Sequence, residues 1–91
     1  VVPVREEAKS KLPAITHVDG TGRLQTVVKE ESPLYYRLIE TFGEASGVPV
    51  VLNTSFNLRG EPIVNTPADA WRTFTASEMD KLVVGNFLMS K

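Results

Sequence analysis

The sequence contains no cysteine and only one histidine, His17, among its 91 residues. Without cysteine the chain can form neither a disulfide nor a thiolate zinc site, and one imidazole gives a metal ion too few ligands. We therefore expect no metal site made by this chain alone. The absence of disulfides also fits a reducing compartment, so a cytoplasmic location is expected.

The sequence also lacks an excess of basic charge and a long apolar run. Ten lysines and arginines stand against eleven acidic residues, giving a formal charge of −1. A domain that binds nucleic acid or an anionic membrane surface usually presents a strongly basic face, so neither partner is expected. No apolar run is long enough to cross a bilayer. Any site for an anion must therefore be local.

What is present describes one ordinary globular domain over residues 1–91, with 42% hydrophobic and 23% charged residues. The order of strands, helix, strand, polar loop, helix and strands predicts an α+β fold close to α/β, a twisted mixed sheet packed with two main helices. The opening run, residues 1–4, is apolar and has no initiator methionine, which predicts excision from a longer protein. The expected strands cover residues 14–18, 23–28, 48–52, 81–84 and 87–89.

Two serine or threonine residues, each followed by proline, predict the helix starts. Ser32-Pro33 and Thr66-Pro67 combine a capping hydroxyl with a proline at the first helical position, and Gly47 predicts the end of the first helix. Apolar residues at helical spacing predict the buried faces of both helices. They are Leu34, Tyr35, Leu38, Ile39, Phe42 and Ala45 in the first helix and Ala70, Trp71 and Phe74 in the second.

The first candidate site is the polar segment 53–62, which follows an apolar strand. It contains Asn53, Thr54, Ser55, Asn57, Arg59, Gly60 and Glu61. Hydroxyls, amides and backbone N–H groups can line a concavity for an oxyanion, and an arginine can bind phosphate through two parallel hydrogen bonds. The alternative is that these residues only make turns and satisfy backbone groups.

The second candidate site is the segment from His17 to Gln25. Asp19-Gly20-Thr21 permits a close approach of backbone to a ligand, and Arg23 can pair with phosphate or carboxylate. The alternative is a simple hairpin with Asp19-Gly20 in its turn and a surface arginine. His17 is expected to be a satisfied strand histidine.

Taken together, ordered blocks along nearly the whole chain resemble the carboxy-terminal domain of the nodulation-factor and antibiotic O-carbamoyltransferases. The segment from Ser55 to Gly60 also resembles the Ser-x-Asn-x-x-Gly loop of the wider YrdC-like superfamily. The blocks that carry the resemblance are residues 17–21, 23, 25–27, 47–49, 53–57, 60–64, 67–70 and 79–82.

The resemblance implies part of a YrdC-like module that binds carbamoyl phosphate and ATP with Mg²⁺ and forms carbamoyl-adenylate. A separate amino-terminal domain of actin-like ATPase fold would then transfer the carbamoyl group to a hydroxyl. Arg23 and Arg59 would contact phosphate or carbamoyl oxygens, and Ser55 and Asn57 the nucleotide phosphates. Asn53 and Thr54 would shape the loop, while Asp19 and Glu61 would orient an arginine or help place Mg²⁺.

Two parts of the family pattern are absent from these 91 residues, the upstream lysine- and arginine-bearing motif and the amino-terminal domain. The chain alone is therefore expected to have no transferase turnover. A truncated sheet would expose an apolar face or an unpaired edge, so we also expect a homo-oligomer. A non-catalytic binding or oligomerisation module, and an RNA-binding YrdC-like domain, remain as alternatives.

Overall fold

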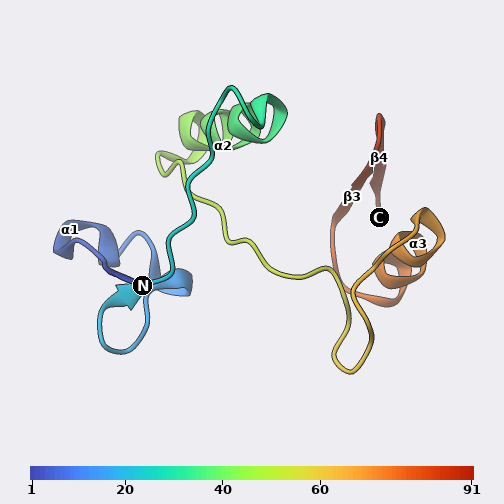
Figure 1. The fold of residues 1–91 in the computed structure, drawn as a ribbon, viewed down its shortest axis with the longest axis horizontal. Helices are drawn as coiled ribbons and strands as arrows, with labels where there is room; N and C mark the ends of the chain where they lie inside the picture. Colours follow the sequence, from blue (N-terminus) through green and yellow to red (C-terminus); the bar gives the residue numbers. More distant parts are fainter. The chain divides into compact units, whose positions relative to one another are not determined.

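The computed structural model describes residues 1–91, which divide into two compact units, Val1–Asn53 and Thr54–Lys91. Helices and small antiparallel sheets occur together, so the predicted α+β class is confirmed (Figure 1). None of the helices combines the length and the apolar character that crossing a membrane requires.

The first unit begins with a short strand pair. Strand β1 (Val2–Pro3) runs antiparallel to β2 (Thr21–Gly22), and helix α1 (Glu6–Lys9) and a 3-10 turn (Pro13–Ile15) lie between them in the sequence. Gly22 is buried at the pairing, where an added Cβ would lie 3.0 Å from the Ile15 carbonyl oxygen. Glycine is therefore required by close packing at this position.

Helix α2 (Pro33–Ser46) confirms the first predicted helix. It ends at Gly47, which has a φ of +82° and donates its N–H to the Gly43 carbonyl, as a left-handed glycine cap does. The Ser32 side chain makes no capping hydrogen bond, contrary to the prediction.

The predicted apolar stripe of α2 does not form a core within this chain. No residue of α2 is buried, and Leu34 is 81% exposed. The interpretation of Tyr35 and Phe42 as core residues is therefore wrong for these 91 residues, because no other helix or strand packs extensively on α2.

The segment after α2 folds back against the helix instead of entering a sheet. A Cβ at Gly43 would lie 2.5 Å from the Pro49 Cβ, so only glycine allows this approach. The predicted strand at 48–52 is absent, because the Val50 N–H donates to the Val48 carbonyl in a tight turn. Leu52 is 63% exposed, so the prediction of a strand buried on both faces is wrong.

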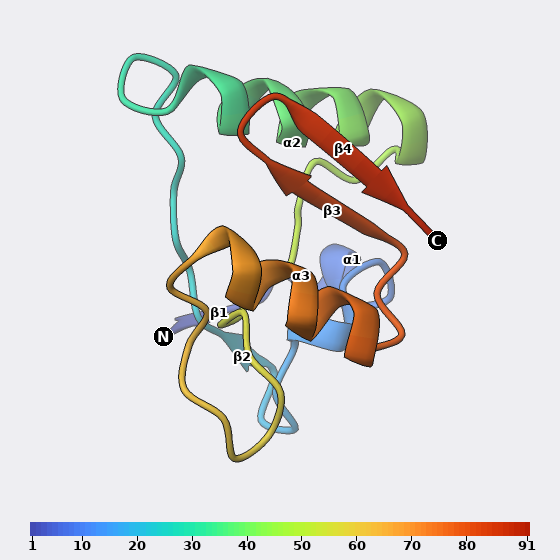
Figure 2. The same cartoon turned by 90° about the vertical axis from the view of Figure 1, so that its right-hand side faces the viewer.

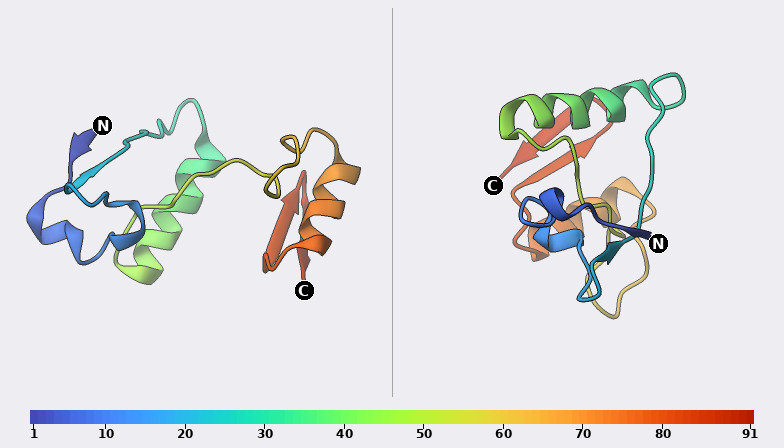
Figure 3. Two further views of the ribbon diagram at one scale, coloured as in Figure 1. Left: turned by 90° about the horizontal axis from the view of Figure 1, so that it is seen from below. Right: turned by 90° about the vertical axis from the view of Figure 1, so that its left-hand side faces the viewer.

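The second unit packs one helix on one hairpin, α3 (Pro67–Ala76) on β3 (Lys81–Val84) and β4 (Phe87–Ser90). The hairpin pairs Val84 with Phe87 across Gly85-Asn86, the two residues between the predicted strands 81–84 and 87–89. Figures 2 and 3 show the hairpin beside α3. The Thr66 hydroxyl accepts a hydrogen bond from the Asp69 N–H at 3.1 Å, which confirms the predicted cap.

The buried apolar side chains of the whole chain are Ala70, Phe74 and Leu82, all in the second unit. Phe56, Val64, Val84 and Met89 pack against them in partly buried positions. Trp71 is half exposed, so its predicted inward orientation is wrong. Its ring instead lies 6.1 Å from that of Phe74, centroid to centroid.

The predicted single mixed sheet is replaced by two separate two-stranded antiparallel sheets. Residues 13–15 form the 3-10 turn where a strand was predicted over 14–18, and residues 23–28 form no strand. A strand needs a neighbour to bond its N–H and C=O groups, and these segments meet none in this chain. Their β-branched composition is not sufficient without that neighbour.

Candidate functional site

The Asp19-Gly20 pair makes the tight turn that its sequence predicts. The His17 carbonyl accepts from the Gly20 N–H at 2.9 Å, the Thr21 carbonyl accepts from the His17 N–H at 2.7 Å, and Gly20 has a φ of +83°. The turn connects the chain into β2 rather than joining the two longer strands that were predicted. His17 is exposed on this turn, with Nδ1 3.3 Å from the Thr21 hydroxyl, so it is not a strand histidine.

The Asp19 carboxylate is bound by the turn itself. Its Oδ1 accepts from the Thr21 hydroxyl at 2.6 Å and from the Thr21 N–H at 3.0 Å. These two hydrogen bonds stabilise the carboxylate and so lower the pKa of Asp19 below its ordinary value. The bond from the Thr21 hydroxyl makes the larger contribution. Asp19 therefore stays charged and shapes the turn next to Arg23, with which it forms no ion pair.

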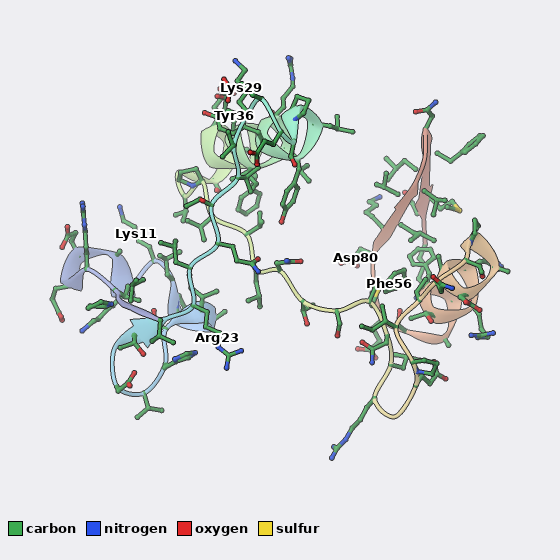
Figure 4. The ribbon with its side chains drawn as sticks, viewed as in Figure 1. Lys11, Arg23, Lys29, Tyr36, Phe56 and Asp80 are labelled. Carbon is green, nitrogen blue, oxygen red and sulfur yellow. The ribbon has the colours of Figure 1, made fainter.

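A cavity of about 930 Å³ lies entirely within the first unit. Arg23 from the segment after β2 and Asn53 from the end of the unit both line it, so two of the predicted site residues share one hollow. Arg23 is exposed and makes no ion pair, so its guanidinium is free for an anionic ligand. Figure 4 labels Arg23 and Tyr36 of α2, which lines the same cavity.

The segment 53–62 is held together largely by its own side chains. The Ser55 hydroxyl donates to Asn57 Oδ1 at 2.6 Å, and Asn57 Nδ2 donates to the carbonyls of Leu58 and Glu61, each at 3.1 Å. Because both N–H groups of the Asn57 amide are used, binding of a phosphate by this amide would require one of these bonds to open. The turn-forming alternative accounts for Ser55 and Asn57 at least as well as phosphate binding does.

The tip of the same segment offers a free cation. Arg59 is exposed and forms no ion pair, and it precedes Gly60, which has a φ of +85°. Thr54 and Glu61, in the same segment, are exposed as well. An exposed arginine at a turn can reach a phosphate without breaking an existing interaction.

The predicted site residues divide between the two units. Asp19, Gly20, Thr21, Arg23 and Asn53 belong to the first, and Thr54, Ser55, Asn57, Arg59, Gly60 and Glu61 belong to the second. The meeting of Arg23 and Arg59 at one ligand therefore stays a prediction. No three histidine, aspartate or glutamate side chains gather as metal ligands anywhere in the chain.

The site contains one residue pair that the sequence did not single out. Gln25 lines the cavity and its Oε1 accepts from Asn53 Nδ2 at 3.1 Å, although 28 positions separate the two in the chain. Tyr35 and Tyr36, from the first turns of α2, line the same cavity. No local pattern announces a contact over such a separation, since only folding brings the segments together.

Comparison with known proteins shows the family of this chain. The model of the family described as "Carbamoyltransferase C-terminus" matches residues 1–91, the whole chain. The chain belongs to this carbamoyltransferase family. The predicted resemblance to O-carbamoyltransferases is thereby confirmed.

Several relatives are longer proteins, and this chain matches only a small part of each. It is 52% identical over all its residues to nodulation protein NolNO of Sinorhizobium fredii, and 50% identical to nodulation protein NolO of Bradyrhizobium diazoefficiens. It is 40% identical, over 91% of its length, to a 3'-hydroxymethylcephem-O-carbamoyltransferase of Streptomyces clavuligerus. The chain spans 13%, 17% and 16% of these proteins, respectively.

Proposed function

We propose that this chain supplies part of the site at which a carbamoyltransferase binds carbamoyl phosphate and ATP and forms carbamoyl-adenylate. Family membership over residues 1–91 supports carbamoyl transfer as the activity of the complete protein. The observation that carries the assignment to this chain is the unpaired Arg23 in a cavity that it shares with Asn53. A free guanidinium and an amide suit the oxygens of phosphate and carbamoyl groups.

Carbamoyl phosphate first loses its phosphoryl group to water, which gives carbamate and inorganic phosphate. A carbamate oxygen then bonds to the α-phosphorus of ATP while pyrophosphate leaves. Negative charge spreads over the phosphoryl oxygens during this step, and fixed cations stabilise it without exchanging protons. Arg23 and Arg59 are the residues proposed for this role, because both are exposed and free of ion pairs. An arginine stays charged at every physiological pH.

Mg²⁺ belongs to this proposal as part of the Mg·ATP substrate. The chain gathers no carboxylate cluster, so the phosphates would supply most of the metal's ligands. Glu61 is an exposed carboxylate in the segment that also bears Arg59, and it is the residue proposed to help place the ion. Asp19 is the weaker candidate because Thr21 already binds its carboxylate.

Transfer to the final hydroxyl is proposed to occur on a separate amino-terminal domain of actin-like ATPase fold. This chain, together with neighbouring sequence of the complete protein, is proposed to form a YrdC-like module. The resemblance of the segment from Ser55 to Gly60 to the YrdC-like loop supports this. The name of one relative specifies a hydroxymethylcephem as its acceptor. For the protein that contains this chain, we propose only that the acceptor is a hydroxyl group. The 91 residues alone are expected to bind ligands without turnover.

Isothermal titration of carbamoyl phosphate and of Mg·ATP tests the proposal. R23A and R59A should each weaken binding by about tenfold or more, because each removes a charged hydrogen bond to the ligand. R37A is the matched control, since Arg37 is an exposed arginine of α2 outside the cavity lining. Equal affinities for R23A, R59A and R37A, or no binding at millimolar ligand, would contradict the assignment. Sustained turnover by the 91 residues would contradict the expected inactivity.

The second candidate function is a non-catalytic oligomerisation module. The observation in its favour is the exposed apolar stripe of α2, with Leu34, Leu38 and Phe42 open to solvent. Sedimentation at micromolar concentration tests self-association. A dimer without ligand binding would favour this candidate, and a monomer that binds carbamoyl phosphate would reject it.

A further inference from the structure

The amide pair of Gln25 and Asn53 has hydrogen-bonding capacity left over. Asn53 Nδ2 donates to Gln25 Oε1 at 3.1 Å, and neither side chain forms another hydrogen bond within the chain. Asn53 therefore keeps one N–H and its carbonyl oxygen, and Gln25 keeps both N–H groups of its amide. Both residues are exposed and both line the cavity, so these groups are open to a ligand.

The hydrogen bond between the two amides couples their orientations. An isolated amide can turn over and exchange its oxygen for its nitrogen, and it then distinguishes poorly between a donor and an acceptor on a ligand. Turning Asn53 alone would bring its oxygen against the Gln25 oxygen, so while Nδ2 donates to Gln25 the Asn53 oxygen stays open to a ligand. In this arrangement Asn53 presents an acceptor beside a donor, which is the pattern that complements the amino group and adjacent ring nitrogen of adenine.

The cavity that the amide pair lines also offers aromatic surface. Tyr35 and Tyr36 come from the beginning of α2, and Tyr35 remains 38% exposed. Stacking on an aromatic side chain stabilises any purine, whereas the amides supply the selectivity. The cavity volume of about 930 Å³ lies within the range of small-molecule and cofactor sites.

We propose that the Gln25–Asn53 pair recognises the adenine ring of the nucleotide, with Tyr35 or Tyr36 against the face of the ring. This inference rests on the proposed function, because it assigns the base of the same nucleotide whose phosphates Arg23 would contact. Arg23 lines the cavity too, and an arginine favours the two acceptors of guanine. A preference for guanine over adenine is therefore the alternative, and the experiment distinguishes the two.

The experiment measures binding of ATP, ITP and GTP, each with Mg²⁺, to the natural polypeptide that carries this chain. ITP replaces the adenine amino group by a carbonyl and leaves the phosphates unchanged. Adenine recognition by the paired amides in this arrangement predicts that ATP binds about tenfold or more tightly than ITP and GTP. Equal affinities for ATP and ITP, or tighter binding of GTP, would overturn the inference. This comparison needs no variant and is independent of any effect on folding.

Variants then assign the selectivity to the amide pair. N53A and Q25A should each reduce the ratio of ATP to ITP affinity by about tenfold. Q25A removes no group proposed to contact carbamoyl phosphate, so it should leave carbamoyl phosphate binding unchanged. N65A is the matched control, because Asn65 is an exposed asparagine outside the cavity and should keep the ratio. An unchanged ratio in both N53A and Q25A overturns the role of the pair. If the protein binds carbamoyl phosphate and binds ATP, ITP and GTP equally, only the adenine inference is refuted. If it binds neither carbamoyl phosphate nor any of the three nucleotides, the proposed function is refuted as well.

Discussion

Thr21 and Asp19 together set the geometry next to Arg23. The threonine donates to the Asp19 carboxylate through both its hydroxyl and its N–H, and its carbonyl accepts from the His17 N–H. These bonds close the turn that precedes the cavity-lining segment. The Asp19 carboxylate therefore stabilises the turn, and any effect on ligand binding would be indirect, through the position of Arg23.

The pKa of Asp19 gives a direct measure of this turn. T21V removes the hydroxyl and keeps the N–H, so the pKa of Asp19 should rise toward the ordinary aspartate value of about 3.9. In the native chain the pKa of Asp19 is lowered, so its carboxylate contributes fully to stability at pH values above the ordinary aspartate pKa. This contribution is lost as the pH falls through the lower pKa that Asp19 has in the folded chain. Carbon-13 NMR of the carboxyl group during an acid titration reports the shift.

T21S is the matched control for this prediction because serine keeps the donating hydroxyl. Its Asp19 should titrate as in the native chain. If T21V and T21S give the same Asp19 pKa, the hydroxyl is not the main cause of the lowering. The turn would then depend on its backbone bonds alone.

The two long helices show that similar start signals can act differently. Both α2 and α3 begin with a hydroxyl residue followed by proline, but only Thr66 accepts a hydrogen bond from its helix. Ser32 has a φ of −138° and a ψ of 68°, outside the extended region in which a capping side chain usually bonds. Helix α3 also packs on β3 through Ala70 and Phe74, whereas α2 buries nothing.

Substitution of the two cap residues tests this difference. T66A should destabilise the second unit by about 1 kcal/mol, because the Asp69 N–H loses its acceptor. S32A should change stability by less than about 0.5 kcal/mol, since Ser32 makes no capping bond. Urea unfolding followed by circular dichroism measures both, and T66S should retain the native value. A larger loss in S32A than in T66A would contradict the assigned caps.

Across the chain, burial is concentrated in one of the two units. Ala70, Phe74 and Leu82 lie in the second unit, and the only buried residue of the first is Gly22. Phe74 is 2% exposed and forms the centre of this small core. The first unit, which holds the cavity, therefore derives little stability from apolar burial of its own.

Hydrogen exchange should follow this distribution. Amides of α3 and β3 should exchange most slowly, and those of α2 should exchange faster despite the greater length of that helix, because tertiary packing rather than length protects a helix in water. Two-dimensional NMR in deuterated buffer at low protein concentration provides the rates. Slower exchange in α2 than in α3 would indicate that another surface covers the apolar stripe.

The sequence by itself determined the elements that carry their signals locally. Proline at a helix start, glycine at Gly47 and the Gly85-Asn86 turn act over a few residues, so α2, α3 and the β3–β4 hairpin were predictable. Asp19-Gly20 likewise determined its turn. The ordered sequence blocks also carried the family resemblance, which needs no coordinates.

Only the tertiary structure decided which segments pair and which side chains share a cavity. The predicted strands at 14–18, 23–28 and 48–52 failed because strand formation depends on a partner segment, and residue composition cannot supply one. The meeting of Gln25 with Asn53 beside Arg23 was equally hidden. Contacts between residues far apart in the chain arise from loop closure and packing of the whole unit, which no local sequence pattern encodes.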